Sequence, residues 1–133
     1  MDTGKSALGL DGNVAAALGY PIGIIAIISL IMEKENRFVK FHALQSLLLH
    51  VAAIILMIAM WIISAVVFVG GMAASVATNT GAIGGLATML MGLIWFVFVI
   101  LYIVGLVMSA VKAYQGAWFK LPLIGGMAEK WTS

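Results

Sequence analysis

Hydrophobic residues dominate the chain in three long runs, and short polar or glycine-rich segments separate them. The first run, Asn13 to Met32, has no charged side chain and ends abruptly at the charged segment Glu33 to Arg37. At about 1.5 Å of rise per residue, a helix of about 20 residues reaches about 30 Å, the hydrocarbon thickness of a bilayer. This pattern predicts a first transmembrane helix over residues 13–32.

The second uncharged stretch is much longer than one span requires. No Asp, Glu, Lys or Arg occurs between Phe41 and Val111, and the middle of this stretch, 70–85, gathers five glycines. Such a cluster favours turns over helix. We therefore predict two further helices, 41–69 and 85–111, each long enough to tilt or to project beyond the hydrocarbon.

The amino-acid composition also indicates a protein that lies in lipid. Hydrophobic residues make up 64% of the chain and charged residues only 9%, whereas a soluble domain has about a quarter charged residues. A small soluble domain cannot bury that much apolar surface, so we expect lipid to cover it. The predicted fold class is all-α, a multi-pass membrane protein whose transmembrane domain is 13–113.

The cations predict the orientation of the helices. Lys34, Arg37 and Lys40 lie between the first two spans, and three lysines follow the third. Since Lys and Arg near span ends favour the cytoplasmic side, both groups are expected inside. Three crossings then place the segment 1–12 outside the cytoplasm and the C-terminus inside.

The tail 114–133 alternates aromatic residues with lysines and contains glycines and a proline that interrupt a long helix. Aromatic and lysine side chains suit the headgroup layer, so we expect the tail to lie along the cytoplasmic interface. The predicted interfacial anchors are Arg37, Lys40, Lys112, Trp118, Lys120 and Trp131.

The second span begins with polar residues on one helical stripe, which we call the polar strip: His42, Gln45, Ser46 and His50. Polar groups are costly in hydrocarbon, so this strip is expected to face other helices or water. One interpretation is hydrogen bonding between helices. The alternatives are a proton path, a chlorophyll or haem ligand, or a polar translocation groove. The two histidines are about 12 Å apart along the helix, too far to share one metal ion.

Small residues mark predicted packing surfaces. In the first span, Gly19, Pro21 and Gly23 combine a close-approach spacing with a proline that should kink the helix. A broken helix can also mark a transport site. In the third span we predict packing at Gly92, Gly105 and Ser109.

The sequence carries no pattern typical of an active site. No carboxylate lies within a predicted span, and the chain has no cysteine. No glycine loop is followed by the residues of a phosphate cradle. The sequence therefore predicts a protein that is not an enzyme and that contains no resident metal.

Several segments carry a family resemblance: Gly19-Tyr-Pro, Arg37-Phe-Val-Lys-Phe-His-Ala-Leu-Gln-Ser46, and Lys112-Ala-Tyr-Gln-Gly116 with Lys120-Leu-Pro-Leu-Ile-Gly125. Over about 13–130 the chain resembles a family of small prokaryotic membrane proteins of unknown function. That family is similar to the Tic20-type subunit of the chloroplast inner-envelope protein import machinery. The resemblance implies a helical membrane protein that works within a larger assembly, including the handling of other polypeptides.

These observations favour an accessory, scaffold or assembly subunit in the prokaryotic cytoplasmic membrane. Its expected partners are lipid and larger membrane proteins or further copies of the chain, with no nucleic acid. One alternative is a Tic20-like component of polypeptide translocation, or a small conduit that uses the polar strip. Another is a subunit of a photosynthetic or respiratory complex in which a histidine binds chlorophyll or haem.

Overall fold

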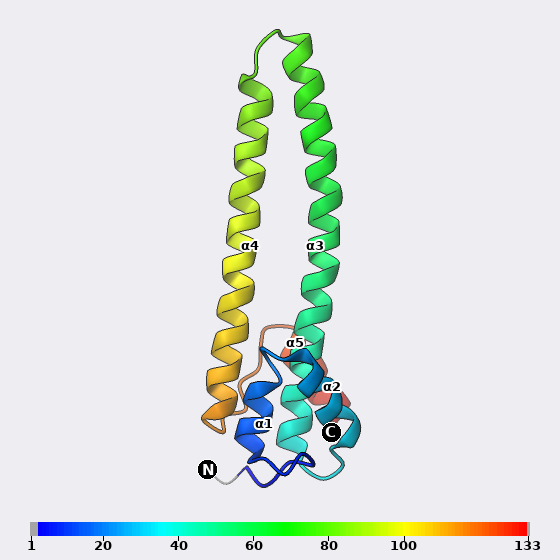
Figure 1. The fold of residues 1–133 in the computed structure, drawn as a ribbon, viewed down its shortest axis with the longest axis vertical. Helices are drawn as coiled ribbons and strands as arrows, with labels where there is room; N and C mark the ends of the chain where they lie inside the picture. The colour runs from blue at the N-terminus through cyan, green and yellow to red at the C-terminus, as the bar shows by residue number, and fades with distance from the viewer. Residues whose placement is uncertain (1–2, 133) are drawn as a thin grey trace. The chain divides into compact units, whose positions relative to one another are not determined.

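The computed structural model describes residues 3–132, and all the regular elements in that range are helices (Figure 1). They are α1 (Gly12–Leu18), α2 (Gly23–Met32), α3 (Arg37–Ala77), α4 (Ala82–Tyr114) and α5 (Ile124–Thr132). By length and composition, α3 and α4 are each able to cross a membrane. The predicted helical class and the two long apolar helices are therefore confirmed.

The chain divides into two compact units, which are described separately. One unit, which we call the head unit, comprises the residues up to Ala52 and those from Ile103 onward. The other, the hairpin unit, comprises Ala53–Tyr102. No charged residue occurs in the hairpin unit, so the seven cations and five acidic residues of the chain all belong to the head unit sequence.

The prediction of a single helix over 13–32 with a kink at Pro21 is wrong, because the structure contains two helices that are separated between Leu18 and Gly23. Pro21 has no backbone N–H, and its ring disfavours helical geometry at the residue before it. The two helices that result have 7 and 10 residues, and each is shorter than the about 20 residues that a span requires. The proline interrupts the helix fully instead of bending it.

The residues that precede and follow the segment 13–32 also lie together within the head unit. The Asn36 side chain donates from Nδ2 to the backbone oxygen of Thr3 over 2.7 Å. A segment that crossed the bilayer once would hold its two ends about 30 Å apart. This contact is incompatible with the predicted placement of 1–12 across the membrane from the loop before α3.

The predicted glycine-rich connection 70–85 is much shorter in the structure. α3 continues to Ala77 and α4 begins at Ala82, so only a tight turn remains, with Asn79 in the left-handed region at φ 51°. The helices have 41 and 33 residues, which corresponds to about 60 Å and about 50 Å. Most of the glycines predicted to form a loop are therefore helical.

Two of these helical glycines explain why α3 and α4 continue so far. A Cβ atom added to Gly71 would lie 3.2 Å from the Cα of Gly84. Ser75 bridges the same place, since its hydroxyl donates to the oxygen of Gly71 over 2.8 Å and accepts from the N–H of Gly84 over 3.2 Å. The absence of side chains lets the two backbones approach within the hairpin unit.

In the head unit, small and aromatic side chains form the core. Ala16, Tyr20, Phe38 and Ala113 form one buried cluster, which joins α1 to α3 and α4. α1 and α2 lie beside the first turns of α3, and α5 follows the segment that leaves α4 (Figure 1). The predicted tail thus contains a helix of 9 residues, and its place at the membrane interface stays a prediction.

Replacing Gly84 by alanine should destabilise the hairpin unit. The new Cβ would lie 3.0 Å from the oxygen of Gly71 and 2.7 Å from the hydroxyl of Ser75. Gly85→Ala is the matched control, because nothing lies within 4 Å of its added Cβ and alanine improves helix propensity by up to about 1 kcal/mol. Thermal unfolding in mild detergent should place G84A about 1–3 kcal/mol below G85A. Equal stability of the two variants would argue against the close approach.

Candidate functional site

Three members of the polar strip are buried in the head unit. His42, Gln45 and Ser46 each have 0% of their surface exposed. They lie in the first three turns of α3 and contact the break between α1 and α2 and the segment that follows α4. Their helical spacing places them on one stripe, and the structure covers this stripe with protein.

Gln45 is at the centre of these contacts. Its side-chain Nε2 donates to the hydroxyl of Tyr20 over 2.6 Å and to the backbone oxygen of Phe119 over 3.0 Å. Its Oε1 accepts the backbone N–H of Leu121 over 3.0 Å. One buried amide therefore joins α3 to the α1–α2 break and to the tail.

His42 uses both of its ring nitrogens. Nε2 lies 3.1 Å from the backbone oxygen of Ala117, and because a carbonyl only accepts, Nε2 carries a proton. In the neutral ring Nδ1 then accepts from the hydroxyl of Tyr20, 3.0 Å away. The Tyr20 oxygen accepts in turn from Gln45, so one consistent set of donors and acceptors satisfies all three side chains.

Ser46 contacts the helix break directly. Its hydroxyl donates to the backbone oxygen of Gly19 over 2.7 Å. Gly19 ends α1 and lies against Ala26 of α2, since a Cβ added to it would be 3.4 Å from that of Ala26. The predicted close packing at Gly19 therefore occurs inside the chain.

Aromatic rings enclose His42. The ring centroids of Phe38 and Phe41 lie 4.6 Å and 5.0 Å from that of His42. Trp118 packs on the same two phenylalanines, with centroid distances of 5.4 Å and 5.2 Å. Trp118 was predicted as an interfacial anchor, and in the structure one side of its ring contacts this cluster while 44% of the residue stays exposed.

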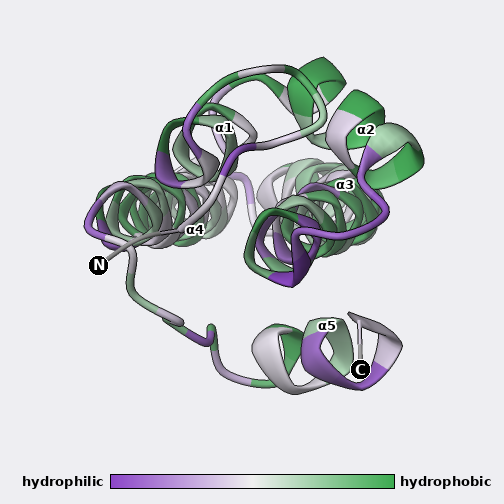
Figure 2. Cartoon of the chain, turned by 90° about the horizontal axis from the view of Figure 1, so that it is seen from below, coloured by the Kyte–Doolittle hydropathy of each residue, from purple (hydrophilic) through white to green (hydrophobic). Residues whose placement is uncertain are grey.

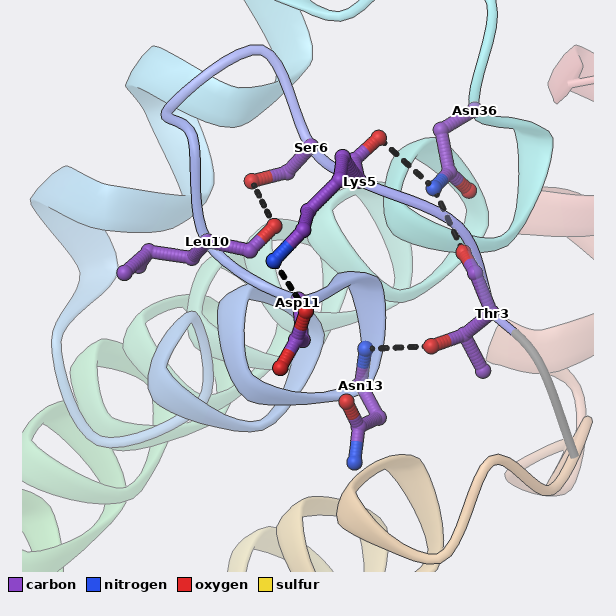
Figure 3. Close-up of polar contacts among 7 residues, drawn as sticks. All are labelled: Thr3, Lys5, Ser6, Leu10, Asp11, Asn13 and Asn36. Atoms are coloured by element: carbon purple, nitrogen blue, oxygen red, sulfur yellow. Dashed lines mark hydrogen bonds and ion pairs between the residues drawn. The ribbon is translucent and has the colours of Figure 1, made fainter.

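A second polar cluster ties the N-terminal segment to the start of α3. Glu33 is 5% exposed; its carboxylate accepts the backbone N–H of Ala7 over 2.7 Å and that of Asn36 over 3.1 Å. Asn36 also donates to the oxygen of Lys5 over 3.2 Å (Figure 3). The available sequence signal was an asparagine preceding a long helix, since its Oδ1 caps the N–H of Val39.

The other site residues predicted from the sequence lie in different surroundings. His50 is half-buried, with Nδ1 2.7 Å from the oxygen of Ser46 in its own helix. Gly23 and Gly92 have open space where a Cβ would be, and Gly105 has only a Leu121 methyl at 4.0 Å. Ser109 is fully buried.

The predicted anchors differ in their surroundings. Arg37 and Trp131 are exposed, and Lys40 and Lys112 are half-buried. Lys120 forms an ion pair with Glu129 over 2.8 Å. The hydrogen bond from Lys120 lowers the pKa of the Glu129 carboxyl, and the positive charges of Lys120 and Arg37 add to this effect.

The buried side chains of the polar strip are hydrogen-bonded within the chain. In residues 3–132, no three His, Cys, Asp or Glu side chains come together as a metal site would need. The buried network of Tyr20, His42 and Gln45 is bound to the backbone of its own chain. Fold and site thus define a helical membrane protein with two long apolar helices and a hydrogen-bonded head unit.

Comparison with known proteins identifies the family. The chain belongs to the magnetosome magnetite crystal formation protein family, whose model matches residues 7–128. A UPF0132 membrane protein of Methanocaldococcus jannaschii is 39% identical, covering 97% of this chain and 96% of the relative. A UPF0132 membrane protein of Archaeoglobus fulgidus is 37% identical, over 89% of this chain and 92% of the relative. The predicted membership in a family of small prokaryotic membrane proteins is confirmed, and no solved structure matches the chain.

Replacing Tyr20 by phenylalanine should destabilise the head unit. The lost hydroxyl leaves one N–H of Gln45 and Nδ1 of His42 without their partner in a buried site, which costs about 1–3 kcal/mol. Tyr114→Phe is the control, because Tyr114 is 61% exposed. Thermal unfolding in detergent measures both variants, and equal stability would show that the network contributes little.

Proposed function

We propose that the protein is a non-enzymatic accessory or scaffold subunit of a larger membrane complex, anchored by α3 and α4. The observation that carries this proposal is that buried side chains of the polar strip form their hydrogen bonds within the chain. Both ring nitrogens of His42 and both ends of the Gln45 amide are bonded within the chain. Groups engaged in this way hold a fold together and are not available to a substrate.

Three of the chain's five acidic side chains are engaged within the chain, which favours an organising role over direct contact with iron. The family description refers to magnetite crystal formation, which would suggest carboxylates as ligands for an ion. In this chain Asp11 pairs with Lys5, Glu129 pairs with Lys120, and Glu33 accepts two backbone N–H groups. We therefore propose that the chain contributes to assembly at a membrane.

A surface for the partner is available in the hairpin unit. A groove of about 400 Å³ is lined by apolar and small residues of α3 and α4, among them Trp61, Ser64, Gly92 and Trp95. Trp95 donates to Ser64 over 2.9 Å, which fixes the indole beside the groove. Gly92 was predicted to pack against a helix, and no atom lies within 4 Å of its added Cβ. We propose that a transmembrane helix of the partner packs there.

Two alternative functions would use side chains of the polar strip that already form hydrogen bonds within the chain. A Tic20-like translocation component or small conduit needs water along the strip, and a chlorophyll or haem subunit needs a free histidine nitrogen. To serve either role, His42 would have to give up a bond to Tyr20 or Ala117. His50, the other histidine of the strip, is half-buried with Nδ1 2.7 Å from the oxygen of Ser46. The scaffold role needs no such rearrangement, and we rank it first for that reason.

Mild detergent extraction from the native membrane should recover the protein in a larger complex, and Gly92→Leu should weaken it because the new side chain fills the groove. Gly70→Leu is the control, since its added Cβ also meets open space and Gly70 does not line the groove. Quantitative mass spectrometry of the co-purified proteins gives the readout. A monodisperse single chain at native expression would overturn the scaffold role. A coloured sample would favour the cofactor alternative.

A further inference from the structure

We infer that α2 is a helix inserted into one leaflet, and that the basic turn after it binds the headgroups of anionic phospholipids in that leaflet. The path of the chain places α2 beside the first turns of α3 (Figure 1). Ser46 contacts Gly19 at the α1–α2 break, and Ser46 lies nine residues, about 14 Å, along α3 from Arg37. The segment therefore rises beside α3 to about half the hydrocarbon thickness.

The segment then returns to the end from which it started. Asn36 binds the backbone oxygens of Thr3 and Lys5, and Thr3 accepts the backbone N–H of Asn13 through its hydroxyl over 2.9 Å (Figure 3). These contacts join the residues before α1 to those after α2. Such a path is a re-entrant hairpin, which a membrane tolerates where protein covers the broken backbone.

α2 presents an apolar stripe that the head unit leaves uncovered. Ile24 and Ile31 are 69% and 74% exposed, and Ile27 and Ile28 lie between them at helical spacing. The opposite face buries Ala26 and Ser29. α2 is hydrophobic over most of its length (Figure 2), and its 10 residues correspond to about 15 Å, the depth of one leaflet.

The charged residues around the turn after α2 indicate which class of lipid would bind there. A polar hollow of about 580 Å³ lies between the N-terminal loop and the turn after α2. Its lining includes the cations Lys5, Lys34 and Arg37 and the acidic residues Glu33 and Glu35. Lys34 and Arg37 take part in neither of the two salt bridges that residues 3–132 form. Met32 lines the same hollow and continues the apolar stripe. Cations beside an exposed apolar helix match a phosphate headgroup with its acyl chains.

The orientation of the chain follows from this path. With α3 and α4 as the two crossings, both termini lie on one side, and all seven cations of the chain can be cytoplasmic. This agrees with the preference of Lys and Arg for that side. The inference does not depend on the proposed scaffold role, because it concerns only the chain and its lipid.

Single-cysteine labelling tests the path, since the sequence contains no cysteine. Ala7→Cys and Glu35→Cys place a thiol at exposed positions before α1 and after α2. A membrane-impermeant maleimide, applied to sealed vesicles of both orientations, should label the two variants from the same face. Labelling from opposite faces would show that 13–32 crosses the membrane and would overturn the inference.

Lipid titration tests the headgroup contact. Native mass spectrometry of the purified chain with dioleoylphosphatidylglycerol should show about thirtyfold weaker binding for K34Q/R37Q, since each cation contributes about fivefold near an anionic surface. K112Q/K130Q removes the same charge elsewhere and should keep the wild-type affinity. Thermal unfolding without added lipid should be equal for the two variants, which separates binding from folding. Unchanged affinity in K34Q/R37Q, or binding of phosphatidylcholine as tight as that of phosphatidylglycerol, would overturn the assignment.

Discussion

The helix break around Pro21 requires hydrogen-bond partners that an apolar environment cannot supply. Proline removes one backbone donor, and the turn between α1 and α2 leaves carbonyl groups outside any regular helix. In water such groups would be solvated, whereas in or near hydrocarbon each unsatisfied group costs several kcal/mol. Ser46 of α3 meets this requirement at Gly19, because its hydroxyl donates to the backbone oxygen of Gly19. Gln45 binds the same region through the side-chain hydroxyl of Tyr20. The geometry of the head unit depends on this satisfaction.

The same residues set the position of the tail. The Gln45 amide that binds Tyr20 also binds the backbones of Phe119 and Leu121. The side-chain conformation of Gln45 that reaches the α1–α2 break therefore also holds the segment before α5. Gly125 shows how closely this segment packs, because an added Cβ would lie 2.8 Å from Oε1 of Gln45. A larger residue there would displace the amide from both partners. The break and the tail are therefore coupled through one side chain.

Sequence reasoning found the helical class, the two long helices and the polar strip, because hydropathy and helical spacing are local properties. It treated Pro21 as a kink, since proline in a membrane helix is tolerated when neighbouring groups satisfy the backbone. Whether Ser46 lies opposite Gly19 depends on the tertiary path, which a pattern does not contain. The contact of Asn36 with Thr3 was missed for a similar reason, since both residues resemble ordinary loop residues. The glycines of 70–85 were wrongly assigned to a turn. Gly71 and Gly84 lie against each other across α3 and α4, and a sequence pattern does not show such a contact.

The two units satisfy their polar groups in different ways, and this difference separates their roles. In the hairpin unit the hydroxyls of Ser75, Thr78 and Thr88 each donate to the carbonyl four residues earlier in the same chain. Ser75 and the Trp95–Ser64 pair also bridge α3 and α4. Bonds to the carbonyl of the preceding turn need no tertiary partner, so they do not involve the outward surface of the two helices. In the head unit Tyr20 and Gln45 bind across elements, so a change at one site alters several contacts. Partner contacts in the hairpin unit can consequently vary while the head unit keeps one structure.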